Sequence, residues 1–186
     1  MHINYEFKAR VTDIAGLEQR LLELNPLFTG EDHQVDTYFN VKKGRMKLRE
    51  GTIENSLIYY ERPDLTGPKK SDVLLYEHTR ATILKEILTK VHGIKAVVDK
   101  VRRIYFIDNV KFHFDNVKGH GTFVEVEAID KTGELGLEKI TEQCNYYARL
   151  FDIKQEDYVG ISYSDLVFTT PPVEERIKLP GITSPV

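Results

Sequence analysis

Hydrophobic and polar residues alternate over long stretches of this chain, and residues 3–11 show the pattern most clearly. In the segment INYEFKARV, polar or charged residues at every second position are separated by residues that are mainly apolar. Successive side chains of a β-strand point to opposite faces, so this spacing predicts a strand with one charged and one apolar face. The charged face carries Asn4, Glu6, Lys8 and Arg10. One such strand is ordinary, but later segments repeat the pattern with charges of both signs.

Seven further segments are predicted to be strands. They cover residues 33–40, 44–50, 55–62, 73–79, 96–107, 110–117 and 122–129. Most of them are separated by short turns, such as the one at Lys42-Lys43-Gly44 and the one at Asp108-Asn109. Eight mainly antiparallel strands are enough to close a barrel, which is the architecture that we expect.

Three segments have apolar residues at helical spacing and fill the longer connections. They cover residues 13–24, 82–92 and 134–151. Thr12 or Asp13 is expected to cap the first helix, and Thr79 or Thr82 the second, because short polar side chains satisfy the free N–H groups of a first turn. The sequence therefore predicts an α+β fold, with helices packed outside an eight-stranded antiparallel barrel.

The chain length and composition favour one domain with a tail. The 186 residues are 41% hydrophobic and 30% charged, which is enough for one sizeable core. Residues 1–168 are expected to form this domain. Residues 169–186 contain four prolines and little apolar periodicity, so they are expected to be an extended tail.

The charge and the single cysteine narrow the class of protein. A net charge of −3 does not favour a general binder of nucleic acid or of anionic membranes. Cys144 has no second cysteine with which to form an internal disulfide. The first ten residues lack the apolar core of a signal peptide, and no apolar run is long enough to span a membrane. These features predict a soluble, cytoplasmic protein.

The charged faces of the predicted strands suggest a binding site inside the barrel. If the apolar faces pack outward against the helices, the charged faces line the interior. The predicted lining is Glu6, Lys8, Arg45, Lys47, Arg49, Arg62, Lys100, Arg102, Asp115, Glu125 and Glu127. Burying an uncompensated ion costs several kcal/mol, so such an interior must hold water or a matching ligand. Lys and Arg bind phosphate oxygens and carboxylates bind divalent metals, so a polyanion with a metal would match. The alternative is a plain sandwich whose charged faces are solvated.

Several of these residues lie in motifs that resemble a known family. The motifs are Glu6-Phe7-Lys8, KLR at 47–49, YYERP at 59–63, KVRR at 100–103, HFD at 113–115 and EVE at 125–127. Together they resemble the CYTH superfamily, also called triphosphate tunnel metalloenzymes, over residues 2–167. The wording GRMKLRE and YYERPDLTGPKKSD is most similar to the class IV adenylyl cyclase branch.

The resemblance implies a role for each charged position. Phosphate would be bound by Lys8, Arg45, Lys47, Arg49, Arg62, Lys100 and Arg102, with Arg103 as a weaker candidate. Mg²⁺ or Mn²⁺ would be bound by Glu6, Glu125 and Glu127, and Asp115 would be either a further ligand or an orienting group. Glu6, Lys8 and Asp115 are the candidate catalytic residues.

The function that the resemblance implies is conversion of ATP to cyclic AMP and pyrophosphate. One alternative is hydrolysis of inorganic triphosphate or of an organic one such as thiamine triphosphate. A third hypothesis is a binder of nucleotides or polyphosphate without catalysis. In each case the partner is a small-molecule triphosphate, and homodimer formation is left open.

One position departs from the family pattern. The family signature begins with E-x-E-x-K, whereas this chain has Asn4 at the first acidic position. The amide of Asn4 still offers a carbonyl oxygen, but the loss of one negative charge weakens a site for a hard cation. Activity, more than fold, depends on this difference.

Three other polar positions have an ordinary interpretation beside a functional one. His113, two residues from Asp115, suits acid–base chemistry, yet a single strand histidine is more often a hydrogen-bonded wall residue. Lys69 and Lys70 are expected in a solvated loop, or folded over the mouth of the barrel.

Overall fold

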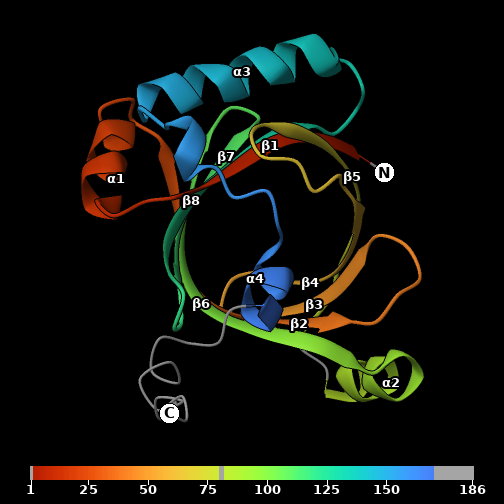
Figure 1. Ribbon diagram of the computed structural model, residues 1–186. Coiled ribbons are helices and arrows are strands. Elements are labelled where there is room, and N and C mark those ends of the chain that lie inside the picture. Colours follow the sequence, from red (N-terminus) through yellow and green to blue (C-terminus); the bar gives the residue numbers. More distant parts are fainter. Residues whose placement is uncertain (1, 80–81, 170–186) are drawn as a thin grey trace, which may run out of the picture.

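The computed structural model describes residues 2–79 and 82–169, and its central feature is a closed β-barrel (Figure 1). The strands are β1 (His2–Arg10), β2 (Leu27–Phe39), β3 (Arg45–Gly51), β4 (Asn55–Glu61), β5 (Lys69–Glu77), β6 (Ile94–Ile107), β7 (Val110–Val117) and β8 (Gly121–Asp130). Their order around the barrel is β1-β5-β4-β3-β2-β6-β7-β8, and every neighbouring pair is antiparallel. The predicted eight-stranded antiparallel barrel is therefore confirmed.

Helices lie outside the barrel and across one of its ends. They are α1 (Ile14–Leu22), α2 (Thr82–His92), α3 (Gly136–Leu150) and α4 (Tyr163–Thr169), with a short 3-10 helix at Gln155–Asp157. In Figure 1, α1, α2 and α3 lie outside the ring of strands, whereas α4 lies within its outline. Among the described residues, no helix combines the length and the apolar character that crossing a bilayer requires.

The largest apolar core lies between the outer wall of the barrel and the helices α1 and α3. Three side chains on the outward faces of β1, β7 and β8, Phe7, Phe112 and Val126, are at most 1% exposed there. They pack with Leu21 of α1 and Cys144 of α3. Burying one Phe side chain contributes about 1.5–3 kcal/mol, so this outer core accounts for much of the stability of the wall. Because the apolar core lies outside the barrel, the inward faces of the strands can carry charged side chains.

Several of the described strand and helix bounds differ from the predictions. β2 begins at Leu27 rather than at residue 33, because its first residues pair with the end of β6 although their side chains are mostly exposed. β5 begins at Lys69 rather than at residue 73, so Lys69 and Lys70 are strand residues and not a loop. Neither a strand nor a helix was predicted at 163–169, where the structure has α4. α3 begins at Gly136 rather than at residue 134.

The start of α1 follows the prediction. Asp13 is its N-cap, and its carboxylate accepts a hydrogen bond from the backbone N–H of Gly16 at 2.9 Å. Residues 80–81, which lead into α2, and residues 170–186 of the predicted tail 169–186 lie outside the described residues, whereas Thr169 belongs to α4.

Candidate functional site

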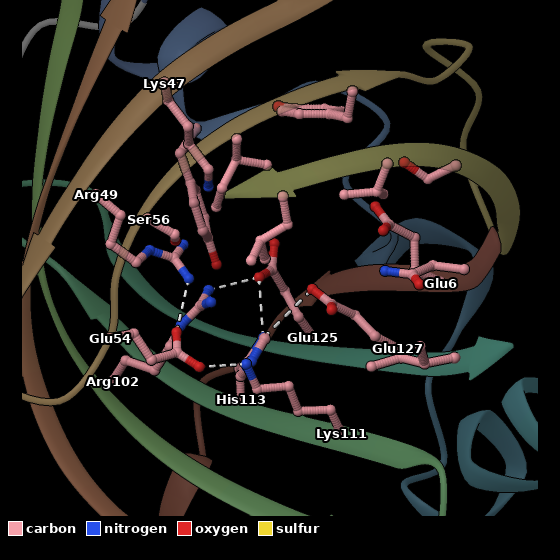
Figure 2. A pocket seen from close by; sticks show the side chains of 18 of the residues that line it. Glu6, Lys47, Arg49, Glu54, Ser56, Arg102, Lys111, His113, Glu125 and Glu127 are labelled. Carbon is pink, nitrogen blue, oxygen red and sulfur yellow. Dashed lines mark hydrogen bonds and ion pairs between the residues drawn. The ribbon is translucent and has the colours of Figure 1, made fainter. Parts of the chain in front are cut away.

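The barrel encloses a cavity of about 650 Å³, lined mostly by polar and charged side chains. Eight of the eleven side chains that we expected on the inner face line it: Glu6, Lys8, Lys47, Arg49, Arg62, Arg102, Glu125 and Glu127. Arg45, Lys100 and Asp115 do not line it. Figure 2 shows the carboxylates and cations converging from opposite walls.

The helix α4 closes one end of this cavity. The ring of Tyr163 lies under Lys8, with 3.8 Å between Nζ and the ring centroid, and the Tyr163 hydroxyl donates to Asp115 Oδ2 at 2.8 Å. Asp165 holds the helix to the barrel by accepting from Arg45 at 3.0 Å. Arg45 therefore contributes to the attachment of α4 and lies outside the cavity.

The opposite end of the cavity is open and partly apolar. Ile53, Leu75, Phe106 and Ile129 line the cavity there, and Ile53 and Leu75 are 42% and 47% exposed. Such a mouth admits a ligand from solvent and provides apolar contact for an organic group next to the charged interior.

A buried carboxylate, Asp36 of β2, organises the cations on one wall. It accepts from Arg49 Nε at 2.9 Å and Nη2 at 3.0 Å, from Lys47 Nζ at 3.0 Å and from Lys100 Nζ at 2.8 Å. Burial alone would raise the pKa of Asp36, but these three cations hold it well below its usual range. Burial lowers the pKa of Lys100 to about 7, and Arg102 and Arg49 add to the effect. Lys100 thus lies behind the cavity wall, bound to Asp36.

A second buried carboxylate, Asp115 of β7, positions Arg102. The guanidinium donates to both oxygens of Asp115, at 2.6 and 2.5 Å, and its Nη2 also donates to Glu125 at 2.6 Å. Asp115 is fully buried, and Tyr163 donates a further hydrogen bond to it. Of the two roles considered for Asp115, the geometry favours the orienting group over the metal ligand.

Sequence reasoning missed Glu54 and Lys111 as members of the cavity. Glu54 lies in the turn between β3 and β4 and accepts from Arg49 Nη1 at 2.8 Å and from Lys111 of β7 (Figure 2). Burial raises the pKa of Glu54, but Arg49 and Lys111 lower it further than burial raises it. Strand alternation predicts the direction of strand side chains but not of turn side chains, so the position of Glu54 became clear only from the fold. Lys111 could have been predicted from the sequence, because it lies two residues before His113 and therefore on the same strand face.

The carboxylates of β8 lie beside charged residues of the neighbouring strand β1. Glu6 is paired in register with Glu127, and Lys8 with Glu125. Glu125 is bound by Lys8 at 3.0 Å, and Glu6 forms an ion pair with Arg62. For Glu125, burial raises the pKa but Lys8 and Arg102 hold it well below its usual range. Burial raises the pKa of Glu127 to about 7, with the negative charge of Glu6 as the next cause.

Two neutral side chains beside these carboxylates have atoms with no hydrogen-bond partner among the described residues. One is the Oδ1 atom of Asn4, which lines the cavity and is 5% exposed. The other is the imidazole of His113, which is 1% exposed. Burial and the charges of Arg102 and Lys111 lower the pKa of His113 to about 3, so its ring is neutral at physiological pH.

His113, Glu125 and Glu127 together are suited to hold a divalent metal. Each offers one donor atom, and these atoms lie within 4.8 Å of one another. Carboxylate oxygen and neutral imidazole nitrogen are both common metal ligands, and Asn4 adds a free carbonyl oxygen nearby on β1. The residues present therefore fit a metal of the kind that the sequence predicted, with His113 as an addition to the expected ligands.

The comparison with protein families gives one match, and this match covers most of the chain. A family model described as the CYTH domain matches residues 2–156. No curated protein matches the chain.

Several solved structures share the fold. PH1012 from Pyrococcus horikoshii OT3 is 26% identical, with a TM-score of 0.71 over 89% of this chain and 99% of that one. A protein from Vibrio parahaemolyticus, named as a candidate adenylate cyclase, is 17% identical, with a TM-score of 0.73 over 89% and 98%. HpAC1 from Hippeastrum is 14% identical, with a TM-score of 0.61 over 93% and 97%, and its name gives it as a candidate adenylyl cyclase with a dominant triphosphatase activity.

Proposed function

Because this chain belongs to the CYTH domain family, we propose that it is a metal-dependent enzyme that binds a triphosphate inside its barrel and cleaves one phosphoanhydride bond. The observation that carries this proposal is the charge of the cavity. Seven Lys and Arg side chains and five Glu side chains line it, a net charge of +2. A triphosphate with about four negative charges, bound together with one divalent cation, has a net charge of about −2 and therefore matches the cavity.

The cations of the cavity would bind the phosphate oxygens. Arg49 and Arg102 are already held in place by the buried carboxylates Asp36 and Asp115, so little side-chain freedom is lost when a phosphate arrives. Lys8, Lys47 and Arg62 would add charge-assisted hydrogen bonds from the other walls. Lys100 would act through Asp36, since it does not reach the cavity.

The metal would be held on the β8 wall. Glu125 and Glu127 are the principal ligands in this proposal, and Glu6 is near enough in the strand register to join them. A bound Mg²⁺ or Mn²⁺ supplies neutralisation of the charge that develops on the phosphate oxygens. The residues themselves position the phosphates and neutralise their charge, and these two effects account for most of the catalysis of phosphoryl transfer by proteins.

The finer proposal is an adenylyl cyclase of the class IV type. In that reaction the ribose 3′ hydroxyl attacks the α-phosphorus, the bond between the α- and β-phosphates breaks, and pyrophosphate leaves. Two features support it: the motifs GRMKLRE and YYERPDLTGPKKSD, and the apolar mouth at Ile53, Leu75 and Phe106, which suits a base. Hydrolysis of a triphosphate is the second candidate, and the dominant triphosphatase activity in the name of HpAC1 favours it.

Product analysis separates these reactions. The protein is incubated with ATP, thiamine triphosphate and inorganic triphosphate, each with Mg²⁺ and with Mn²⁺, and the products are resolved by anion exchange. Cyclic AMP with pyrophosphate supports the cyclase, and orthophosphate supports the triphosphatase. Triphosphate binding with no product from any substrate would leave only a binding protein.

Variants test the assigned residues. Glu125→Gln and Glu127→Gln should each abolish turnover without unfolding the protein, because each removes a negative charge from the metal site. Arg49→Ala should weaken triphosphate binding, which should also weaken with added salt. Arg103→Ala is the matched control, because Arg103 lies on the outer wall, where it donates to Glu18 at 2.7 Å. Equal binding by both arginine variants would remove Arg49 from the site.

We also propose that residues 1–168 form the functional unit and that the tail is dispensable. A chain that ends at Thr169 keeps the whole of α4. It should bind inorganic triphosphate as tightly as the full chain, and a loss of binding would assign the tail a role in the site.

A further inference from the structure

The imidazole of His113 occupies an unusual position for a wall residue. It lies on β7, is 1% exposed, and neither ring nitrogen has a hydrogen-bond partner in the part of the chain that the structure describes. Buried polar groups are nearly always hydrogen-bonded, and an unsatisfied one costs about 1–3 kcal/mol. The ordinary role of a wall histidine therefore does not account for His113.

The Nδ1 atom of His113 is directed at two carboxylates. It lies 3.5 Å from Glu125 Oε2 and 3.6 Å from Glu127 Oε1, which is too far for good hydrogen bonds (Figure 2). Two donor atoms that share an ion at about 2.1 Å lie about 3.0 Å apart at a right angle and about 3.4 Å apart at a tetrahedral angle. The observed separations are close to the second value, so an ion fits between His113 and either carboxylate with only small movements, and the donor atoms of all three residues lie within 4.8 Å of one another.

The carboxylates retain free lone pairs for such an ion. Glu125 accepts from Arg102 through Oε2 and pairs with Lys8 through Oε1, but a carboxylate has about four acceptor sites. Glu127 has no hydrogen-bond donor among the described residues, and it is exposed to the cavity. Both acids can therefore bind a metal while Arg102 and Lys8 stay in place.

We propose that His113 is a nitrogen ligand to the divalent ion held by Glu125 and Glu127, and that this ligand makes the site bind Mn²⁺ and Co²⁺ in preference to Mg²⁺. The proposal rests on the metal dependence of the proposed function. Mg²⁺ prefers an all-oxygen octahedral shell, whereas imidazole nitrogen suits the transition metals. The preference for one metal over another would then be set by His113 of β7, which is paired with the acidic strand β8.

Pulsed electron paramagnetic resonance of bound Mn²⁺ tests the nitrogen ligand directly and needs no turnover. The full chain is loaded with substoichiometric Mn²⁺, and the electron spin echo is examined for modulation by a coordinated ¹⁴N nucleus. We expect this modulation in the parent protein. His78→Asn is the matched control, because His78 also lines the cavity but does not belong to the cluster of donor atoms that His113, Glu125 and Glu127 form. The signal should persist in His78→Asn and disappear in His113→Asn.

Metal affinities give a second measurement. His113→Asn should weaken Co²⁺ binding by about tenfold or more, as expected when a ligand is lost, and should change Mg²⁺ binding by less than about threefold. Bound Mn²⁺ without nitrogen modulation in the parent, or modulation that survives in His113→Asn, would overturn the proposal. Nitrogen modulation in a protein that turns over no triphosphate would support this inference and contradict the proposed function, so the two can fail separately.

Discussion

The buried carboxylate of Asp36 can be removed by the nearly isosteric change Asp36→Asn, and this should destabilise the protein strongly. Asp36 is fully buried and is the ion-pair partner of Arg49, Lys47 and Lys100. Lys100 suffers most, because its side chain is itself fully buried and Asp36 is the carboxylate that it contacts. Breaking a buried ion pair from one side leaves an uncompensated charge.

The expected loss follows from measurements on other buried pairs. Removing one partner typically costs about 3–5 kcal/mol. For a chain of this size, 1 kcal/mol corresponds to about 2–4 °C in Tm, so a loss of about 4 kcal/mol should lower Tm by about 8–16 °C. Differential scanning calorimetry and urea unfolding measure this difference.

Two further variants isolate the cause. Asp99→Asn removes an exposed carboxylate that contacts His33 and Lys118, and it should cost less than about 1 kcal/mol. The double variant Asp36→Asn with Lys100→Met also removes the buried lysine amine that has lost its partner, so it should be more stable than Asp36→Asn alone by at least about 1 kcal/mol. If Asp36→Asn were no more destabilising than Asp99→Asn, Asp36 would not be the centre of the cation wall.

Three other predictions concern the metal site and the closed end. Asn4→Glu should lower the metal concentration for half-maximal triphosphate turnover by about tenfold, which corresponds to about 1.4 kcal/mol. If the parent protein has no turnover, the variant should gain it. An unchanged metal dependence would exclude Asn4 from the metal shell. Because burial and Glu6 raise the pKa of Glu127 to about 7, the proton must leave before a metal binds, so Mn²⁺ affinity should increase as pH rises through about 7. Calorimetry in two buffers should detect the released proton, and Glu127→Gln should abolish the effect. Tyr163→Phe should cost about 1 kcal/mol by removing the hydrogen bond to Asp115, and an unchanged Tm would show that this bond does not hold α4.

The strand faces could be predicted from the sequence because alternation is a local property. The charges of β1, β3 and β8 were assigned to the interior by counting every second residue, and Glu6, Lys47 and Glu125 lie there. The early start of β2 could not be predicted in this way, since residues 27–31 are mostly exposed and become a strand by pairing with β6.

The parts of the site that the sequence did not reveal depend on contacts between distant segments. Strand alternation places Asp36 on the same face as Gln34, but its role requires Lys100 to lie beside it, which only the pairing of β2 with β6 provides. Glu54 enters the cavity from a turn, where no periodicity applies. The missing partner of His113 is a property of the folded interior and has no counterpart in the sequence.

The closure of the barrel between β1 and β8 has a consequence for how the protein is made. Lys8 meets Glu125 only through this last pairing, and its Nζ also reaches the carbonyl of Ile161, 153 positions along the chain. Contacts so far apart in sequence form slowly, since a long loop must be closed before they give any stabilisation. A nascent chain without β8 has no enclosed cavity, because its first strand presents a charged face with no opposing wall. The ability to bind metal and phosphate should therefore arise in one step, late in synthesis, when the last strand and α4 leave the ribosome.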